Sequence, residues 1–199
     1  MLYLHGGGWS VGTRRRFGRA TIAWDPTAMR RVANSGLAIA SIDYRLVGEA
    51  VFPAPLNDCL AALAWLRSRG AELGINPSRI AVWGESAGGH LAYLVGLTAS
   101  GLRGVAGWYA PTDLTGAAPG SPENTLTGGD AELAQAASPI HHVHAGAPPF
   151  QIHHGTADTM VPIDHSERFV ATLRAVGAPD VEAIFESTLA FASRVTAAC

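Results

Sequence analysis

The chain has 199 residues, of which 48% are hydrophobic and 15% are charged, and its formal net charge is −2 at pH 7. This composition is typical of one globular domain that is large enough to bury a core. Beyond Arg14-Arg15-Arg16 the chain has no basic cluster, so nucleic acid is excluded as a partner.

Cysteine and histidine usage excludes further classes. Cys59 and Cys199 form neither a disulfide framework nor a metal motif. Of the eight histidines, five lie around loops and a strand end without Cys or carboxylate partners at ligand spacing: His141, His142, His144, His153 and His154. The start, Met1 to His5, has no charged region and too short an apolar run for a signal peptide or a membrane span. We therefore expect a cytoplasmic protein without metal; the sequence carries no signal for an oligomeric state.

The first predicted strand, Met1–Leu4, runs into His5-Gly6-Gly7-Gly8-Trp9, a loop with few side chains. Such a loop can turn its backbone amides outward. The N–H groups of Gly7 and Gly8, joined by that of Ala87, would make an oxyanion hole for acyl transfer. A flexible glycine-rich turn is the alternative.

A helical pattern over Pro26–Ser35 is followed by a second apolar run, Leu37–Ile42, which predicts a buried strand. Asp43 and Arg45 come directly after this strand. We expect them to tie loops together through hydrogen bonds.

The segment Pro55–Arg69 has the period of an amphipathic helix, with Gly70 as its stop. Apolar residues recur there at steps of three and four, which places them on one face against the sheet: Leu56, Cys59, Leu60, Leu63 and Leu66.

The most informative stretch is the apolar run from Arg79 that leads into Gly84-Glu85-Ser86-Ala87-Gly88 and then into a helical pattern. A turn from strand directly to helix forces its central residue into strained φ/ψ and holds its side chain clear of the sheet. Negative charge at Ser86 would also be stabilised by the helix N-terminus. Ser86 is therefore a candidate nucleophile, or an incidental serine in a glycine-rich turn.

The rest of the chain continues the alternation of strands and helices. Apolar runs predict strands at Val105–Tyr109, Phe150–His154 and Val181–Glu186, with a helix over Ser166–Val176. Buried strands separated by helices predict an α/β fold with a mostly parallel sheet of about six strands, covered by helices on both faces as a three-layer sandwich.

The segment 112–149 is rich in Gly, Pro, Ala, Ser and Thr, with only a weak helical pattern over Asp130–Ala137. We expect a poorly structured insertion that acts as a lid or substrate-binding loop, or a mobile surface loop. After the next strand, Asp158 lies where a carboxylate would orient a catalytic imidazole; its alternative role is as a turn residue.

Taken together, these motifs resemble the hormone-sensitive-lipase-like esterases of the α/β-hydrolase fold and their feruloyl-esterase and carboxylesterase relatives. The resemblance runs from Met1 to about Glu186. It rests on His5-Gly6-Gly7-Gly8-Trp9, Asp43-Tyr44-Arg45-Leu46, Phe52-Pro53-Ala54-Pro55 with Asp58, Gly84-Glu85-Ser86-Ala87-Gly88-Gly89, Ala137-Ser138-Pro139-Ile140 and His154-Gly155-Thr156-Ala157-Asp158.

The resemblance implies a single α/β-hydrolase domain over 1–199 that acts on carboxylic esters without a cofactor. Ser86 would be the nucleophile and Asp158 the acid, while Gly7, Gly8 and Ala87 would supply the oxyanion hole. The chain order Ser86 before Asp158 is the order that this fold uses.

Two departures from the family pattern matter. The family has two more strands before the first one here, so we expect the domain to be N-terminally incomplete and the strand from Met1 to leave a sheet edge or an apolar face uncovered. The family's catalytic histidine follows the last strand, where this chain reads Ser187-Thr188-Leu189-Ala190-Phe191, and no histidine follows His165. We interpret 187–199 as a divergent tail, with a frameshift as the alternative.

His90, His154 and His165 are weak candidates for a replacement base, His165 because we expect it to be exposed. Three hypotheses on function stand. The chain is a carboxylesterase-type serine hydrolase, or a non-catalytic relative that binds a ligand or a partner in the same pocket, or an amidase or peptidase on the same fold.

Overall fold

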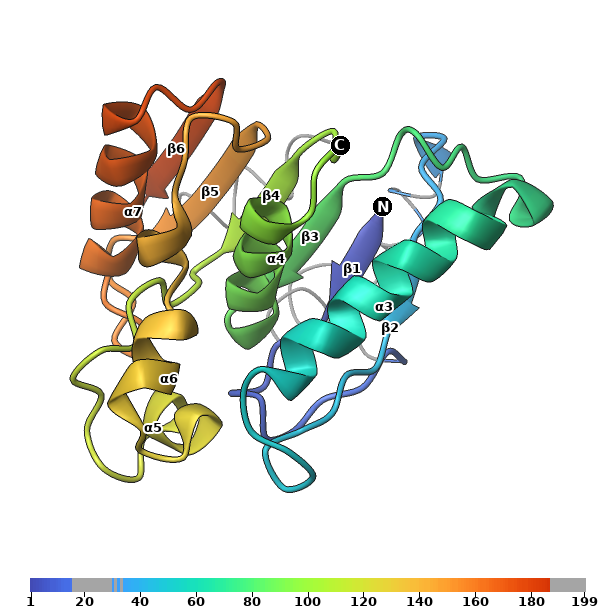
Figure 1. Cartoon of the computed structure of the whole chain (residues 1–199). Helices are drawn as coiled ribbons and strands as arrows, with labels where there is room; N and C mark the ends of the chain where they lie inside the picture. Colours follow the sequence, from blue (N-terminus) through green and yellow to red (C-terminus); the bar gives the residue numbers. More distant parts are fainter. Residues whose placement is uncertain (16–29, 31, 33, 187–199) are drawn as a thin grey trace.

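A computed structural model describes residues 1–15, 30, 32 and 34–186 (Figure 1). Its centre is a six-stranded sheet in the order β2-β1-β3-β4-β5-β6, and every neighbouring pair is parallel. The strands are β1 (Leu2–Leu4), β2 (Ala40–Ile42), β3 (Val82–Glu85), β4 (Val105–Trp108), β5 (Phe150–Gly155) and β6 (Val181–Glu186). The prediction of an α/β fold with a parallel sheet is confirmed.

The expectation that β1 leaves a sheet edge or an apolar face uncovered is wrong. This strand lies between β2 and β3, with Leu2 paired to both Ala40 and Val82, and its three residues are fully buried. The edge strands of the described sheet are instead β2, whose residues are all half-buried, and β6 at the other end. The order of strands in a sheet is not written in the sequence, so a chain that starts in a strand need not place that strand at the edge.

The predicted helix over Pro55–Arg69 is observed as α3 (Ala54–Arg69), with Leu56, Cys59, Leu63 and Leu66 buried. Gly70 does not end it in a left-handed turn. Its φ is −59°, and the chain continues through the 3₁₀ helix η1 (Gly70–Leu73) to Gly74, whose φ of 72° stops the helical path. Within the described ranges, no helix has the length and apolar character needed to cross a membrane.

The other long helices are α4 (Ala87–Thr98) and α7 (Asp164–Ala175). Figure 1 shows α3, α4 and α7 on the same face of the sheet, and the ring of Tyr93 in α4 stacks on Phe169 in α7 with centroids 4.8 Å apart. The predicted helix over Pro26–Ser35 falls largely outside the described residues. Helices on both faces therefore stay a prediction.

The insertion 112–149 is more structured than expected. It contains α5 (Pro122–Thr127), α6 (Ala131–Ala136) and the 3₁₀ helix η2 (Pro139–His142), of which only α6 is predicted by the sequence. Side-chain caps explain their starts, because the Ser121 hydroxyl accepts from the N–H of Asn124, and Asp130 accepts from the first turn of α6. The pattern missed α5 because so short a helix depends on packing, here through the buried Leu126.

A glycine of β4 allows α4 to pack closely on the sheet. A Cβ at Gly107 would lie 2.1 Å from Cε1 of Tyr93, whose ring is held between Phe150 and Phe169. We expect Gly107→Ala to lower the free energy of unfolding by about 1–3 kcal/mol, because the buried ring has no space to move into.

Urea denaturation monitored by circular dichroism measures this change. Gly48→Ala is the matched control, since a Cβ there meets nothing within 4 Å. Equal stability of the two variants would contradict this account of the packing.

Candidate active site

Ser86 lies between β3 and α4 in a strained conformation, with φ 50° and ψ −122°. The left-handed half of φ space is costly for a residue with a Cβ and is found mainly where the surroundings enforce it. Hydrogen bonds hold the backbone on both sides: the N–H of Ser86 donates to Trp108 O at 2.8 Å, and Ser86 O accepts from the N–H of His90 at 2.9 Å. The half-buried serine is thus fixed at the N-terminus of α4.

The two glycines around Ser86 are required by close backbone contacts. A Cβ at Gly84 would lie 2.2 Å from Gly88 O, and a Cβ at Gly88 would lie 2.1 Å from Leu4 O. Real Cβ atoms do not approach oxygen so closely. The first turn of α4 therefore packs directly against the end of β1, which brings the loop after β1 beside Ser86.

This glycine loop also has an unusual backbone. Gly7, Gly8 and Trp9 have φ values of 122°, 58° and 55°. Gly7 O accepts hydrogen bonds from the N–H groups of Ser10 and Val11, which closes a tight turn. By contrast, none of the described residues accepts a hydrogen bond from the N–H of Gly7 or Gly8. These donors are available to a ligand, as is that of Ala87 in the first turn of α4.

A buried histidine and tyrosine hold the glycine loop. The ring of His5 stacks on Tyr44 with centroids 4.3 Å apart, and the Tyr44 hydroxyl donates to His5 O at 2.7 Å. His5 Nδ1 lies 2.9 Å from Gly6 O, and because a carbonyl only accepts, the ring proton lies on Nδ1. Burial lowers the pKa of His5, so the ring stays neutral and keeps this bond.

Two ion pairs hold the loops that follow β2 in place. Arg45 makes a bidentate contact with Asp58, at 2.9 Å from Nε to Oδ2 and 2.8 Å from Nη2 to Oδ1. Asp43 accepts from both the backbone and the side chain of Arg14. These hydrogen bonds lower the pKa of both carboxyl groups. The expectation that Asp43 and Arg45 join loops is confirmed.

Glu85, the residue before Ser86, has a structural role that the sequence did not indicate. Its side chain is buried and accepts hydrogen bonds from the hydroxyls of Tyr3, at 3.3 Å, and Tyr109, at 2.7 Å. Its Cγ also lies 3.4 Å from where a Cβ of Gly6 would be. Burial raises the pKa of Tyr109, which stays protonated as a donor. Glu85 thus joins β1, β4 and the glycine loop to the strand that carries Ser86.

Asp158 lies in the turn after β5. Its Oδ1 accepts from the N–H groups of Met160 and Val161, at 2.8 and 3.0 Å. Its Oδ2 is 3.8 Å from Nε2 of His154 and accepts no hydrogen bond from a described residue. One carboxylate oxygen is therefore fixed by the turn, and the other is available to orient an imidazole.

The strand order brings these parts to one edge of the sheet. The glycine loop follows β1, Ser86 follows β3 and Asp158 follows β5, and because all the strands are parallel, these segments share the carboxyl edge (Figure 1). Ser86 lies between the other two in the strand order. The catalytic roles of Ser86, Asp158, Gly7, Gly8 and Ala87 stay predictions.

The three candidate replacement bases have other partners. His90 is fully buried, with Nε2 2.6 Å from Ala137 O, and burial lowers its pKa to about 4. The buried His154 contacts Ser166 Oγ through Nδ1, at 2.7 Å, and Val161 O through Nε2, at 2.8 Å. Both rings are held as structural side chains.

His165 is half-buried, not exposed as predicted. Its Nδ1 accepts from the N–H groups of Thr112 and Asp113, at 3.2 and 3.4 Å, which joins the insertion to the start of α7. In the part of the chain that the structure describes, no three His, Cys, Asp or Glu side chains gather as metal ligands. The segment Ser187–Phe191, where the family pattern has its histidine, lies outside the described residues.

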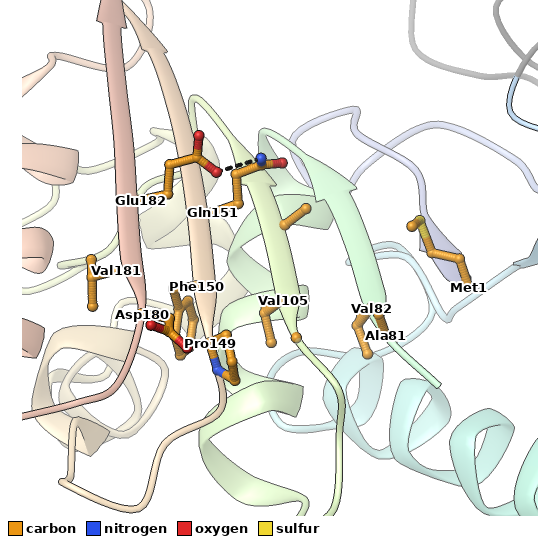
Figure 2. A pocket seen from close by; sticks show the side chains of 12 residues that line it. Met1, Ala81, Val82, Val105, Pro149, Phe150, Gln151, Asp180, Val181 and Glu182 are labelled. Carbon is orange, nitrogen blue, oxygen red and sulfur yellow. Dashed lines mark hydrogen bonds between the residues drawn. The ribbon is translucent and has the colours of Figure 1, made fainter. Parts of the chain in front are cut away.

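A cavity of about 530 Å³ lies at the opposite edge of the sheet (Figure 2). It is lined by the first residues of four strands, Val82, Val105, Phe150 and Val181, and Gln151 donates to Glu182 at 2.7 Å beside it. Because Ser86 follows the last residue of β3, this cavity is separated from it by the length of the strand.

Comparison with known proteins agrees with this geometry. The sequence model of the BD-FAE family matches residues 1–173. The chain is 32% identical to "Esterase LipQ" of Mycobacterium tuberculosis, in an alignment that covers 91% of this chain and 47% of LipQ. "Carboxylesterase NlhH" of the same species is 39% identical over 52% of this chain and 30% of its own length. The chain thus spans about half the length, or less, of these curated relatives.

Solved structures show the same fold. A "truncated form of carbohydrate esterase from gut microbiota" has a TM-score of 0.78 at 27% identity, and covers 94% of this chain and 75% of its own. The propionate-bound esterase Est2 of Thermogutta terrifontis has a TM-score of 0.77 at 26% identity, and covers 99% and 79%. Both similarities extend over almost all of this chain.

The buried His90 makes stability depend on pH. Its pKa falls from 6.5 to about 4 on folding, so the unfolded chain binds the proton more tightly. Its contribution is complete above pH 6.5 and is lost as the pH falls toward 4. Between pH 7 and pH 4.5 we expect the free energy of unfolding to drop by about 2–3 kcal/mol more in the unsubstituted chain than in His90→Gln.

Denaturant titrations at the two pH values measure this difference. His141→Gln, in the exposed part of η2, is the control and should follow the unsubstituted chain. An identical pH dependence in His90→Gln and the unsubstituted chain would show that His90 is not the group responsible.

Proposed function

The chain belongs to the BD-FAE family, and from this membership we propose that it is a serine hydrolase that cleaves carboxylic esters through an acyl-enzyme on Ser86. The observation that carries the proposal is a strained Ser86 beside a glycine loop in which the N–H groups of Gly7 and Gly8 have no acceptor among the described residues. A serine held in this way next to available backbone donors is suited to attack a carbonyl carbon.

In this proposal, Ser86 Oγ attacks the ester carbonyl while a base takes its proton. The N–H groups of Gly7, Gly8 and Ala87 bind the oxygen on which negative charge develops, and one such donor is worth on the order of 3 kcal/mol in the transition state. The alkoxide leaves with a proton, and water then releases the acyl group from Ser86 by the same steps. Asp158 orients the imidazole and stabilises its positive charge through Oδ2.

We identify no catalytic base among the described residues. No histidine follows His165 in the sequence, and His90, His154 and His165 are each held by other partners. Without a base, a serine hydroxyl is almost wholly protonated at neutral pH and is a poor nucleophile. This observation favours a second candidate function, in which the chain binds a ligand in the same pocket without turning it over.

We further propose that the insertion 112–149 caps the site within a single domain over 1–199. Its support is contact with the catalytic edge, because Pro122 lies 3.5 Å from where a Cβ of Gly8 would be, and Leu126 O accepts from the N–H of Phe52 at 2.9 Å. Within the insertion, the buried hydroxyl of Ser138, the residue before η2, accepts from the N–H of Leu114 at 2.7 Å. This bond joins the beginning of the insertion to its last helical segment.

The remaining parts of the proposal concern the substrate, the cofactor, the partners and the location of the protein. We propose a small-molecule ester as substrate, no cofactor and no nucleic-acid partner, the last supported by the net charge of −2. We also propose a cytoplasmic location, because the two cysteines of the sequence do not form a disulfide framework. Amidase or peptidase activity on the same site stays open, and a panel of p-nitrophenyl esters and anilides separates these activities.

We expect the chain as written to hydrolyse p-nitrophenyl butyrate barely above background. Loss of a triad histidine removes on the order of 10⁶ in turnover and leaves about 10³–10⁴ over the reaction in water. Replacing Ser187–Phe191 by a Gly-His loop, together with the upstream strands of a relative, should restore activity, and Ser86→Ala in the restored protein should abolish it.

Steady-state rates and labelling by a fluorophosphonate probe measure the effect. If the unmodified chain works at ordinary esterase rates, the prediction of a missing base is wrong. Alanine substitutions at His90, His154 and His165 would then identify the residue that serves as base.

A further inference from the structure

One histidine side chain fastens the start of the insertion to the start of α7. Nδ1 of His165, the second residue of α7, accepts from the N–H groups of Thr112 and Asp113, at 3.2 and 3.4 Å. The Thr112 hydroxyl also donates to His165 O at 2.7 Å, and Arg168 of α7 pairs with Asp113. The backbone of the insertion is therefore bound to an acceptor that can gain a proton.

Only the neutral ring of His165 can make this contact. A backbone N–H donates and cannot accept, so Nδ1 carries a lone pair and the ring proton lies on Nε2. In the charged ring both nitrogens are donors, and the proton on Nδ1 would face the N–H groups of Thr112 and Asp113. Protonation of His165 therefore breaks both hydrogen bonds at once.

Two other buried histidines keep their contacts when they gain a proton. Nε2 of His90 and Nε2 of His154 each face a backbone carbonyl oxygen, at 2.6 and 2.8 Å, and such an oxygen accepts from the neutral and the charged ring alike. Nδ1 of His154 faces the Ser166 hydroxyl, which can turn to accept. Of these three histidines, His165 is the one whose contacts change with its charge.

Charged and titratable groups from four segments act on the ring of His165. Burial is the largest influence on its pKa and lowers it. Carboxylates raise this pKa and a guanidinium lowers it; these groups belong to Asp164 and Arg168 of α7, Asp113 at the start of the insertion and Glu123 of α5. From β5 comes the ring of His154, whose own pKa is also lowered by burial.

These influences fix the direction of the pH dependence. Because the pKa of His165 lies below 6.5, the ring is neutral and its two hydrogen bonds are complete above pH 6.5. The bonds are lost as the pH falls through the lowered pKa. The charged ring is then attracted to the carboxylates around it, which favours a position turned away from the backbone donors.

The segment that His165 holds leads into the part of the insertion that contacts the catalytic edge. Thr112 O accepts from the N–H of Ile140 in η2, at 3.1 Å. Further along the same insertion, Leu126 O accepts from the N–H of Phe52 at 2.9 Å. Loss of the His165 contact therefore frees one end of a segment whose middle lies against the catalytic edge.

We propose that His165 is a pH-sensitive latch: the neutral ring holds the insertion against α7, and the protonated ring releases its start and loosens the cap. The latch itself does not depend on ester hydrolysis. Its effect on the site rests on the capping role proposed above for the insertion.

Hydrogen exchange of single amides tests the latch, followed by NMR in the full chain at pH 7.5 and pH 5.0. Rates are compared as protection factors, which remove the pH dependence of exchange in an unfolded chain. We expect the N–H groups of Thr112 and Asp113 to lose about tenfold in protection at pH 5.0. Phe52, at the contact with the cap, should also lose protection, whereas Val105 in β4 should keep it. His90, with a pKa of about 4, stays neutral at both pH values.

Two substitutions at the same position separate the charge of the ring from its role as acceptor. His165→Asn places Oδ1 where Nδ1 lies, so it should accept and protect Thr112 and Asp113 at both pH values. His165→Leu has no acceptor and should leave both amides weakly protected at both pH values. His141→Asn, at an exposed histidine of η2, is the matched control and should behave like the unsubstituted chain.

The latch is refuted if Thr112 and Asp113 keep their protection at pH 5.0 in the unsubstituted chain, or if His165→Asn loses it to the same extent. Equal loss at Val105 would also refute it, because the change would then be global. Loss at Thr112 and Asp113 without loss at Phe52 would support the latch and refute its effect on the cap. Exchange of these amides does not involve Ser86, so inactivity on esters would count against the proposed function alone.

Discussion

The direct contact between α4 and the end of β1 is the constraint on which the site depends. Gly88 allows the first turn of the helix to lie against Leu4 O, and Gly84 allows the same turn to follow β3 without a clash. Because the strand and the helix are packed so closely, the turn between them must be tight. Ser86, in this turn, has a strained conformation with a positive φ. The same contact places the glycine loop, which continues β1, beside Ser86.

Buried polar groups then hold the parts that this contact brings together. His5 and Tyr44 hold the start of the glycine loop, and Glu85, bound by the hydroxyls of Tyr3 and Tyr109, packs beside Gly6. A buried carboxylate without partners would be costly, so these bonds also determine where β1 and β4 end relative to β3. The backbone of the glycine loop beside Ser86 is therefore held by contacts within the chain itself.

Burial and hydrogen-bond partners give the histidines of this chain different structural roles. His90 and His154 are removed from water and bound to backbone oxygens, so the neutral ring is favoured and both become structural. His165 instead joins the insertion to α7 through Nδ1. Among the residues that the structure describes, none donates a hydrogen bond to Oδ2 of Asp158, the atom at which a triad would place its imidazole.

The sequence by itself determined the parallel α/β sheet, the helix Ala54–Arg69 and the turn at Ser86, because these depend on local periodicity and on glycines at fixed spacing. Tertiary structure alone decided that β2, and not β1, is the edge strand on that side of the described sheet, and that α5 forms, since strand order and the packing of a short helix depend on distant residues. It also decided the partners of Glu85, which lie 82 and 24 residues away along the chain. Contacts at such separations leave no periodic signal in the sequence.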